Sequence, residues 1–265
     1  MIKQMVAVRR RPGLTHQECC EYVEIVHGDI ARKEPAGVVR YAQSHAFDGA
    51  FGAKTDMTYQ QFFGRDFITE LFFNSPEDMI SNAATPYVRE VVMPDGRFFN
   101  NFEAVILSTM TETEVPVANP GPGKVKVIHY LKKAEGVSDE AYEKGWADAY
   151  ATSLSKQPAL VAGLRKYVQS RPIKTPGEAS THFGVAKGPF YEGVASMWFD
   201  DEAALPIFRA YETELSQINA ETGPPFIDFS QSFFLYTHEK TIFEIATPNP
   251  LKGALMDLET SKSPL

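Results

Sequence analysis

The feature that most constrains this chain is an internal duplication. Residues 9–45 and 132–171 follow the same order of turn, helix and strand. Corresponding residues are 123 positions apart up to the end of the helix and 126 positions apart from the next strand onward, so one three-residue insertion relates the two copies. A repeat of this length far exceeds a solenoid repeat and indicates two related domains in tandem. The matching pairs are Gly13 and Gly136, Thr15 and Ser138, His27 and Tyr150, Tyr41 and Tyr167, Gln43 and Gln169, Ser44 and Ser170, and Phe73 and Phe199.

Each copy predicts the element order β-α-β-β-α-β, which is the ferredoxin-like arrangement. Helix starts are marked by Thr15 with Glu18 three residues on, as in a capping box, and by Ser75 followed by Pro76. The expected strands are 2–10, 38–47, 67–73 and 102–109, then 124–131, 163–170, 193–199 and 231–238; the expected helices are 15–32 and 75–92, then 138–155 and 200–219.

The two copies are expected to combine into one α+β architecture. A four-stranded sheet with both helices on one side leaves its other side bare, so two such sheets can close on each other as an intramolecular α+β barrel. The stretch 115–123 contains three prolines and two glycines and is predicted to be a linker. We therefore expect domains at 1–114 and 124–241, with a tail at 242–265 that lies across the surface or a partner subunit.

Composition narrows the possible partners. The net charge is −8, with basic residues scattered, which argues against nucleic acid. No stretch reaches the roughly 20 apolar residues of a membrane span, and the N-terminal apolar run is too short for a signal peptide. The only cysteines are the neighbours Cys19 and Cys20, which we interpret as small buried residues and not as a disulfide or metal site. A cytoplasmic protein without metal or cofactor is expected.

The motifs of the first copy resemble the EthD-domain family of the dimeric α+β barrel superfamily. They comprise the run Arg-Arg-Pro-Gly-Leu, Thr15, a helix carrying His27, and the strand Arg40-Tyr41-x-Gln43-Ser44-His45. That family usually has a Tyr-Trp pair ahead of the histidine. Tyr22 and His27 match this pattern, whereas Val23 stands where tryptophan is expected.

The second copy departs further from the same pattern. It keeps Trp146 but has Gly145 for the tyrosine, Tyr150 for the histidine and Arg171 at the end of the strand motif. The resemblance implies a small apolar cavity between sheet and helices. Because two linked copies can close the barrel within one chain, both a monomer and a homodimer are compatible with the sequence. Relatives in the superfamily include cofactor-free decarboxylases, cyclases, isomerases and monooxygenases that act on polyketide-like or aromatic compounds. Fold alone does not determine which reaction applies here.

His27 is the leading candidate for a catalytic residue. It follows Cys20 and Val23 at helical spacing, which predicts a partly desolvated position between helix and sheet. Desolvation favours the neutral imidazole, which can accept a proton. A core histidine bonded to backbone is the alternative. Tyr150 takes the same place in the second copy, and we expect the first copy to be the active one.

The strand motifs supply further candidates. Tyr41 and His45 share a strand face with Gln43, and phenol and imidazole there could stabilise an oxyanion. Tyr167 is the equivalent residue of the second copy. These strand side chains could instead lie in a hydrated interface between the two sheets or face solvent.

Other candidates are a carboxylate, two histidines and several aromatic residues. Glu70 lies between Ile68 and Phe72 on one strand face, so we expect it at a rim or buried beside a base such as His27. His129 is inward-facing, as a cavity residue or a satisfied core group, and His182 is a possible lid residue. The aromatic residues expected to bind substrate are Tyr59, Phe63, Trp146 and Tyr167.

These residues predict a cofactor-independent lyase or cyclase. His27 would remove a proton next to a carbonyl of a small apolar, aromatic or polyketide-like compound, and decarboxylation, dehydration and ring closure all fit. One alternative is a small-molecule carrier that uses the same cavity without turnover. Another is a haem-dependent enzyme, for which His182 or His129 would have to serve as axial ligand.

Overall fold

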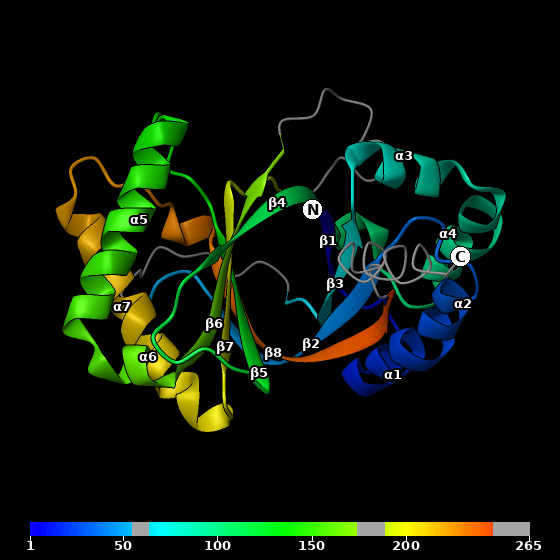
Figure 1. Ribbon diagram of the computed structural model, residues 1–265, viewed down its shortest axis with the longest axis horizontal. Helices are drawn as coiled ribbons and strands as arrows, with labels where there is room; N and C mark the ends of the chain where they lie inside the picture. Colours follow the sequence, from blue (N-terminus) through cyan, green and yellow to red (C-terminus); the bar gives the residue numbers. More distant parts are fainter. Residues whose placement is uncertain (55–63, 174–188, 246–265) are drawn as a thin grey trace, which may run out of the picture.

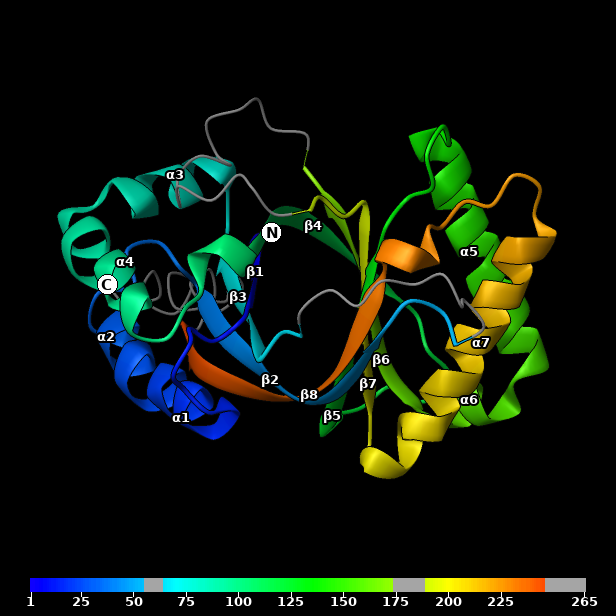
Figure 2. The ribbon, with the colours of Figure 1, turned by 180° about the vertical axis from the view of Figure 1, so that it is seen from behind.

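A computed structural model describes residues 1–54, 64–173 and 189–245. Eight antiparallel strands form one closed barrel in the order β1-β3-β2-β8-β5-β7-β6-β4. Figures 1 and 2 show the helices of the first half on one side of the barrel and those of the second half on the other. The predicted α+β architecture with a closed barrel is therefore confirmed.

The first half supplies four strands and a series of short helical segments. Two of these segments are π-helical turns, marked η1 and η2 below, and η3 and η4 are 3-10 turns. In order the elements are β1 (Ile2–Val8), α1 (His16–Glu21), η1 (Tyr22–His27), α2 (Gly28–Lys33), β2 (Arg40–Phe51), β3 (Phe67–Phe73), α3 (Pro76–Ala84), η2 (Val88–Val92), α4 (Met93–Asp95), η3 (Gly96–Phe98), η4 (Phe102–Ala104) and β4 (Ile106–Val115).

The second half has longer and more regular helices. Its elements are β5 (Val125–Leu131), α5 (Asp139–Lys156), α6 (Pro158–Gly163), β6 (Leu164–Pro172), β7 (Gly193–Phe199), the 3-10 turn η5 (Glu202–Ala204), α7 (Leu205–Glu221), the 3-10 turn η6 (Phe229–Gln231) and β8 (Phe233–Glu244). Strand β8 continues three residues past the expected start of the tail. In the described ranges no helix is long and apolar enough to cross a membrane.

The strand order explains how the two halves close. Within each half the strands stand in the order fourth, first, third, second, so the second and fourth strands are left at the edges. β2 of the first half pairs with β8 of the second, and β4 pairs with β6. Each sheet edge is thus covered by its counterpart, which leaves no unpaired edge in the barrel.

Local sequence signals place the helices. Thr15 and Glu18 form the predicted capping box, and Ser75 caps the helix that starts with Pro76. Gly13 and Gly136, one in each copy, both adopt positive φ, at 91° and 78°. Glycine adopts this conformation without a steric penalty. The same turn therefore leads into the first helix of both halves.

Side chains alternate between the interior of the barrel and its helix-covered outer face. On β3, Ile68 and Glu70 point into the barrel, whereas Thr69 and Leu71 face the helices. The middle of the interior is apolar, with Met5 and Ile128 in its core. This alternation assigns each candidate residue to one face or the other.

Candidate functional site

A cavity of about 150 Å³ lies in the first half, between the outer face of the sheet and the helical segments that cover it. Its walls are mostly apolar. Val8 comes from β1, Leu71 from β3, Val92 from η2, Phe99 from the segment after η3 and Phe243 from β8. Among the described residues, the second half thus contributes to the wall of this cavity only through the strand that it inserts beside β2.

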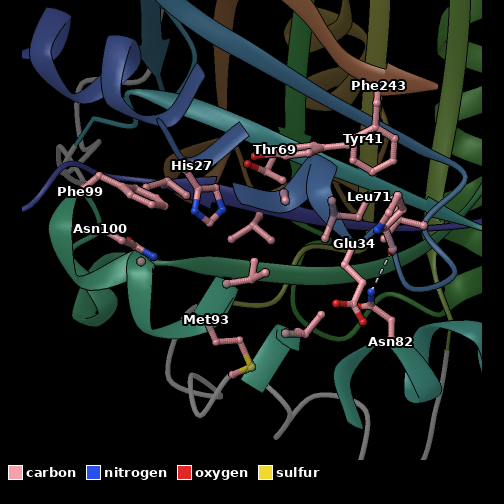
Figure 3. A pocket seen from close by; sticks show the side chains of 18 of the residues that line it. His27, Glu34, Tyr41, Thr69, Leu71, Asn82, Met93, Phe99, Asn100 and Phe243 are labelled. Atoms are coloured by element: carbon pink, nitrogen blue, oxygen red, sulfur yellow. Dashed lines mark hydrogen bonds between the residues drawn. The ribbon is translucent and has the colours of Figure 1, made fainter. Parts of the chain in front are cut away.

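His27 stands at the cavity wall (Figure 3), and the carboxylate of Asp95 lies beside its ring. Its Nδ1 lies 2.8 Å from Oδ2 of Asp95, and its ring packs edge-on against Phe99 with centroids 4.9 Å apart. The hydroxyl of Tyr22 donates to the other oxygen of Asp95, also at 2.8 Å. The side chains of His27 and Asp95 are 14% and 8% exposed, so both are largely desolvated.

Asp95 determines which ring nitrogen of His27 carries the proton. Burial would raise the pKa of Asp95, but the hydrogen bonds from His27 and Tyr22 outweigh burial and hold that pKa below its usual value. The group is therefore a carboxylate at neutral pH and needs an N–H from Nδ1. In this tautomer Nε2 of His27 keeps its lone pair, and no residue of the described ranges bonds to it.

The π-helical turn η1 brings Tyr22 and His27 onto one face. In an α-helix, residues five apart point about 140° away from each other. The wider π turn, with its i→i+5 hydrogen bonds, brings such residues close to alignment, so both reach Asp95. A second π turn, η2, supplies Val88 and Val92 to the same cavity. The expected regular helix over 15–32 is thus interrupted at the segment that carries Tyr22 and His27.

Of the predicted oxyanion residues, Tyr41 lines the cavity and His45 does not. Gln43 links them: its Nε2 donates to the Tyr41 hydroxyl at 2.7 Å, and its Oε1 lies 2.9 Å from Nε2 of His45. Burial raises the pKa of Tyr41 to about 12 and lowers the pKa of His45 to about 4. Tyr41 is therefore a protonated phenol and His45 a neutral imidazole at pH 7.

Glu70 is not beside His27, which corrects that expectation. It lies inside the barrel, on the opposite face of β3, with 1% of its side chain exposed. Lys3 from β1 and Lys126 from β5 both bond to it, and Lys126 also bonds to Glu239 at 2.6 Å. Glu70 thus joins the two halves through buried ion pairs and has no contact with the cavity.

The corresponding space of the second half is filled by aromatic side chains. The ring centroid of Tyr150 lies 4.4 Å from that of Tyr167, in a tilted contact, and 6.4 Å from that of Tyr211, in an edge-to-face contact, while Tyr142 and Trp146 pack at 6.0 Å. All five are buried. Helix α5, which carries Tyr150, lies across the barrel from α1 and α2, so Tyr150 and His27 share no site (Figure 1).

His129 belongs to the core of the second half. It packs against the rings of Phe208, Phe229 and Phe234 at 5.7 to 6.4 Å, and burial lowers its pKa to about 3. This agrees with a core position and not with a cavity residue, but Nδ1 of His129 is buried without a hydrogen-bond partner among the described residues, so the group is not the satisfied one that was expected. The predicted residues Tyr59, Phe63 and His182 lie outside the described residues.

Sequence reasoning missed Asp95 and the cavity amide of Asn100. Asp95 stands in the tripeptide Pro94-Asp95-Gly96, which by itself is typical of a turn after a helix. The expected helix ended near residue 92, so nothing in the local pattern indicated a carboxylate beside His27, 68 positions away.

The described residues do not fit haem. His129 is 2% exposed and its ring contacts the rings of Phe208, Phe229 and Phe234, so a haem ligated by it would have to displace these side chains. The cavity next to His27 is smaller than the roughly 300 Å³ at the low end of pockets for drug-sized ligands. In the described part of the chain no three His, Cys, Asp or Glu residues cluster as metal ligands do.

Comparisons with known proteins connect this geometry to a family and a fold. Residues 11–103 match the family model described as the EthD domain. No curated protein matches the chain. The matching segment contains Tyr22, His27 and Asp95. It also contains every residue of the cavity wall except Val6 and Val8 of β1 and Phe243 of β8.

Solved structures extend the likeness in fold to both halves. An anthrone oxidase-like protein is 11% identical with a TM-score of 0.51, over 93% of this chain and 95% of that chain. A candidate chlorite dismutase is 13% identical with a TM-score of 0.51, over 91% and 95%. A candidate monooxygenase from Fusobacterium nucleatum is 4% identical with a TM-score of 0.50, over 91% and 92%. Residues 11–103 therefore match the EthD domain, and the structure places this segment in a closed eight-stranded α+β barrel.

Proposed function

We propose that the first half binds a small, mostly apolar carbonyl compound and that His27 transfers a proton at the carbon next to the carbonyl. The observation that carries this proposal is the Asp95–His27 pair at the wall of an apolar cavity. Asp95 leaves Nε2 of His27 as the free acceptor and stabilises the imidazolium that forms. A histidine held by a carboxylate is an arrangement suited to general base catalysis.

Tyr41 is the proposed partner for the developing negative charge. Its phenol stays protonated at neutral pH, and Gln43 fixes its oxygen from behind. When Nε2 of His27 accepts the α-proton, the electron pair of the C–H bond forms a carbon–carbon double bond and the π pair of the carbonyl moves to its oxygen, to which the Tyr41 hydroxyl can donate. Expulsion of a leaving group β to the carbonyl then gives a lyase reaction, and attack of the enolate carbon on a second carbonyl carbon of the same molecule gives ring closure, both without a cofactor.

A carrier that does not turn its ligand over is the second candidate. The mostly apolar walls favour it, because such walls bind apolar molecules without any chemistry. We also propose that the two halves are ferredoxin-like units derived by duplication, with only the first retaining a cavity. The barrel closes within one chain, so a homodimer remains a prediction that the site does not require.

The exchange of α-protons separates the enzyme from the carrier. 2-Tetralone, an apolar ketone, is incubated in deuterated buffer, and loss of its α-proton signals is followed by NMR with wild-type protein, His27→Asn and His238→Asn. His238 is a half-exposed histidine away from the cavity and serves as the matched control. Exchange that depends on His27 while 2-tetralone affinity is kept supports catalysis. Equal exchange rates for wild type and His27→Asn would reject it and leave the carrier.

A further inference from the structure

The cavity contains an amide whose oxygen has no hydrogen-bond partner within the part of the chain that the structure describes. Asn100 lines the cavity, and its Oδ1 is buried without a partner among the described residues. Figure 3 shows the Asn100 side chain at the same end of the cavity as His27 and Phe99. Buried polar groups are nearly always hydrogen-bonded, so an unpaired amide beside a base indicates that something else completes its bonding.

The backbone around Asn100 is held firmly. Its N–H donates to the carbonyl of Gly96 at 2.8 Å, and the N–H of Asn101 donates to the carbonyl of Arg9 at 2.9 Å. Asn100 also forms a bridge with Arg10, which follows β1. The amide therefore projects from a fixed base and does not depend on a flexible loop for its position.

Two other polar side chains of the cavity wall, those of Asn82 and Tyr41, already have partners. Asn82 donates to the carbonyls of Pro35 and Ala36 at 3.3 and 3.0 Å. Tyr41 accepts from Gln43. Oδ1 of Asn100 thus differs from these groups, because it is free to accept a hydrogen bond from a molecule inside the cavity.

We propose that Asn100 binds a hydroxyl group of the ligand, so that the ligand of this cavity is a hydroxylated apolar compound, such as a phenol or an enol. A hydroxyl can donate to Oδ1 and accept from Nδ2, so it suits an amide better than a carbonyl, which only accepts. This inference rests on the proposed function for the location of the site. Asn100 is a positioning residue: it sets which atom of the ligand faces Nε2 of His27.

The test compares two probes that differ in one hydrogen-bond donor. 2-Naphthol and 2-methoxynaphthalene are titrated into wild type, Asn100→Leu, Asn100→Asp and Asn119→Leu, and affinity is measured by fluorescence. Leucine matches asparagine in shape and removes its polar atoms, while aspartate keeps acceptor oxygens. Asn119 is an exposed asparagine between β4 and β5 and provides the matched control. Thermal melting confirms that each variant is folded.

Wild type and Asn119→Leu should prefer 2-naphthol by roughly three- to tenfold, the range expected for one neutral hydrogen bond. Asn100→Leu should bind both probes equally, and Asn100→Asp should keep the preference. If wild type does not discriminate, or if Asn100→Leu still discriminates, the inference is overturned. His27→Asn should keep the preference for 2-naphthol. Failure of the α-proton exchange assay therefore counts against His27 as the base, whereas failure of the probe assay counts against Asn100 as the residue that binds the hydroxyl.

Discussion

The substitution Glu70→Gln tests whether the buried carboxylate of the barrel is structural. Glu70 accepts from Lys3 at 2.9 Å and also bonds to Lys126, and all three side chains are about 1% exposed. Removing one partner of a buried ion pair costs about 3–5 kcal/mol. Here Lys3 keeps Glu112 at 3.1 Å and Lys126 keeps Glu239 at 2.6 Å, so neither lysine is left without a carboxylate. We therefore expect Glu70→Gln to lower the free energy of unfolding by about 3 kcal/mol, the lower end of this range.

That loss corresponds to a measurable change in melting temperature. With an unfolding entropy of roughly 2.1 cal/mol/K per residue, a chain of 265 residues should melt about 5 °C lower. Calorimetry and urea unfolding at pH 7 measure this. Glu112→Gln is the matched control, because the side chain of Glu112 is 30% exposed and its removal should cost less than about 1 kcal/mol.

The dependence on pH provides an independent check. Burial would raise the pKa of Glu70, but Lys126 and Lys3 together hold it well below its usual range. A carboxyl group with a depressed pKa stabilises the fold above its unfolded value of about 4.3, and this stability is lost as the pH falls through the folded value. The difference between wild type and Glu70→Gln should therefore shrink below about pH 4.

One result would refute this reasoning. If Glu70→Gln is as stable as Glu112→Gln at pH 7 but no longer exchanges the α-protons of 2-tetralone, the carboxylate acts in catalysis and not in the barrel. If Glu70→Gln is less stable than wild type but exchanges the α-protons of 2-tetralone at the same rate, the structural role of Glu70 is supported.

Two further predictions concern the cavity side of the sheet. Asp95→Asn should slow α-proton exchange on the order of 10²-fold at unchanged 2-tetralone affinity. The reason is that an amide can donate to Nδ1 of His27 and so place the proton on Nε2, which then cannot accept another. NMR measures the rates, and equal rates in the two proteins would contradict a role of the Asp95–His27 pair. His45→Gln should flatten the stability profile between pH 4 and 6.5. Burial lowers the folded pKa of His45 to about 4, so in that window the unfolded chain binds the extra proton and wild-type stability rises with pH. Urea melts across this window measure the slope, and an identical slope in both proteins would contradict the assignment.

The amino-acid sequence by itself determined the features that depend on near neighbours. The capping box at Thr15 and the helix start at Ser75 were predictable because a cap involves residues only three positions apart. The shared face of Tyr41, Gln43 and His45 followed from strand alternation alone. The duplication predicted a barrel closed within one chain, because two copies of one unit bring matching strand edges.

Only the tertiary structure decided which of these residues form a site. Asp95 meets His27 because the second helical segment continues past its expected end and packs beside a π turn, and no local pattern specifies an i→i+5 turn. Glu70 faces Lys126 of the other half because strand pairing closes the barrel around it. Such contacts join residues far apart in the chain, so they depend on packing and register, which short-range sequence patterns do not encode.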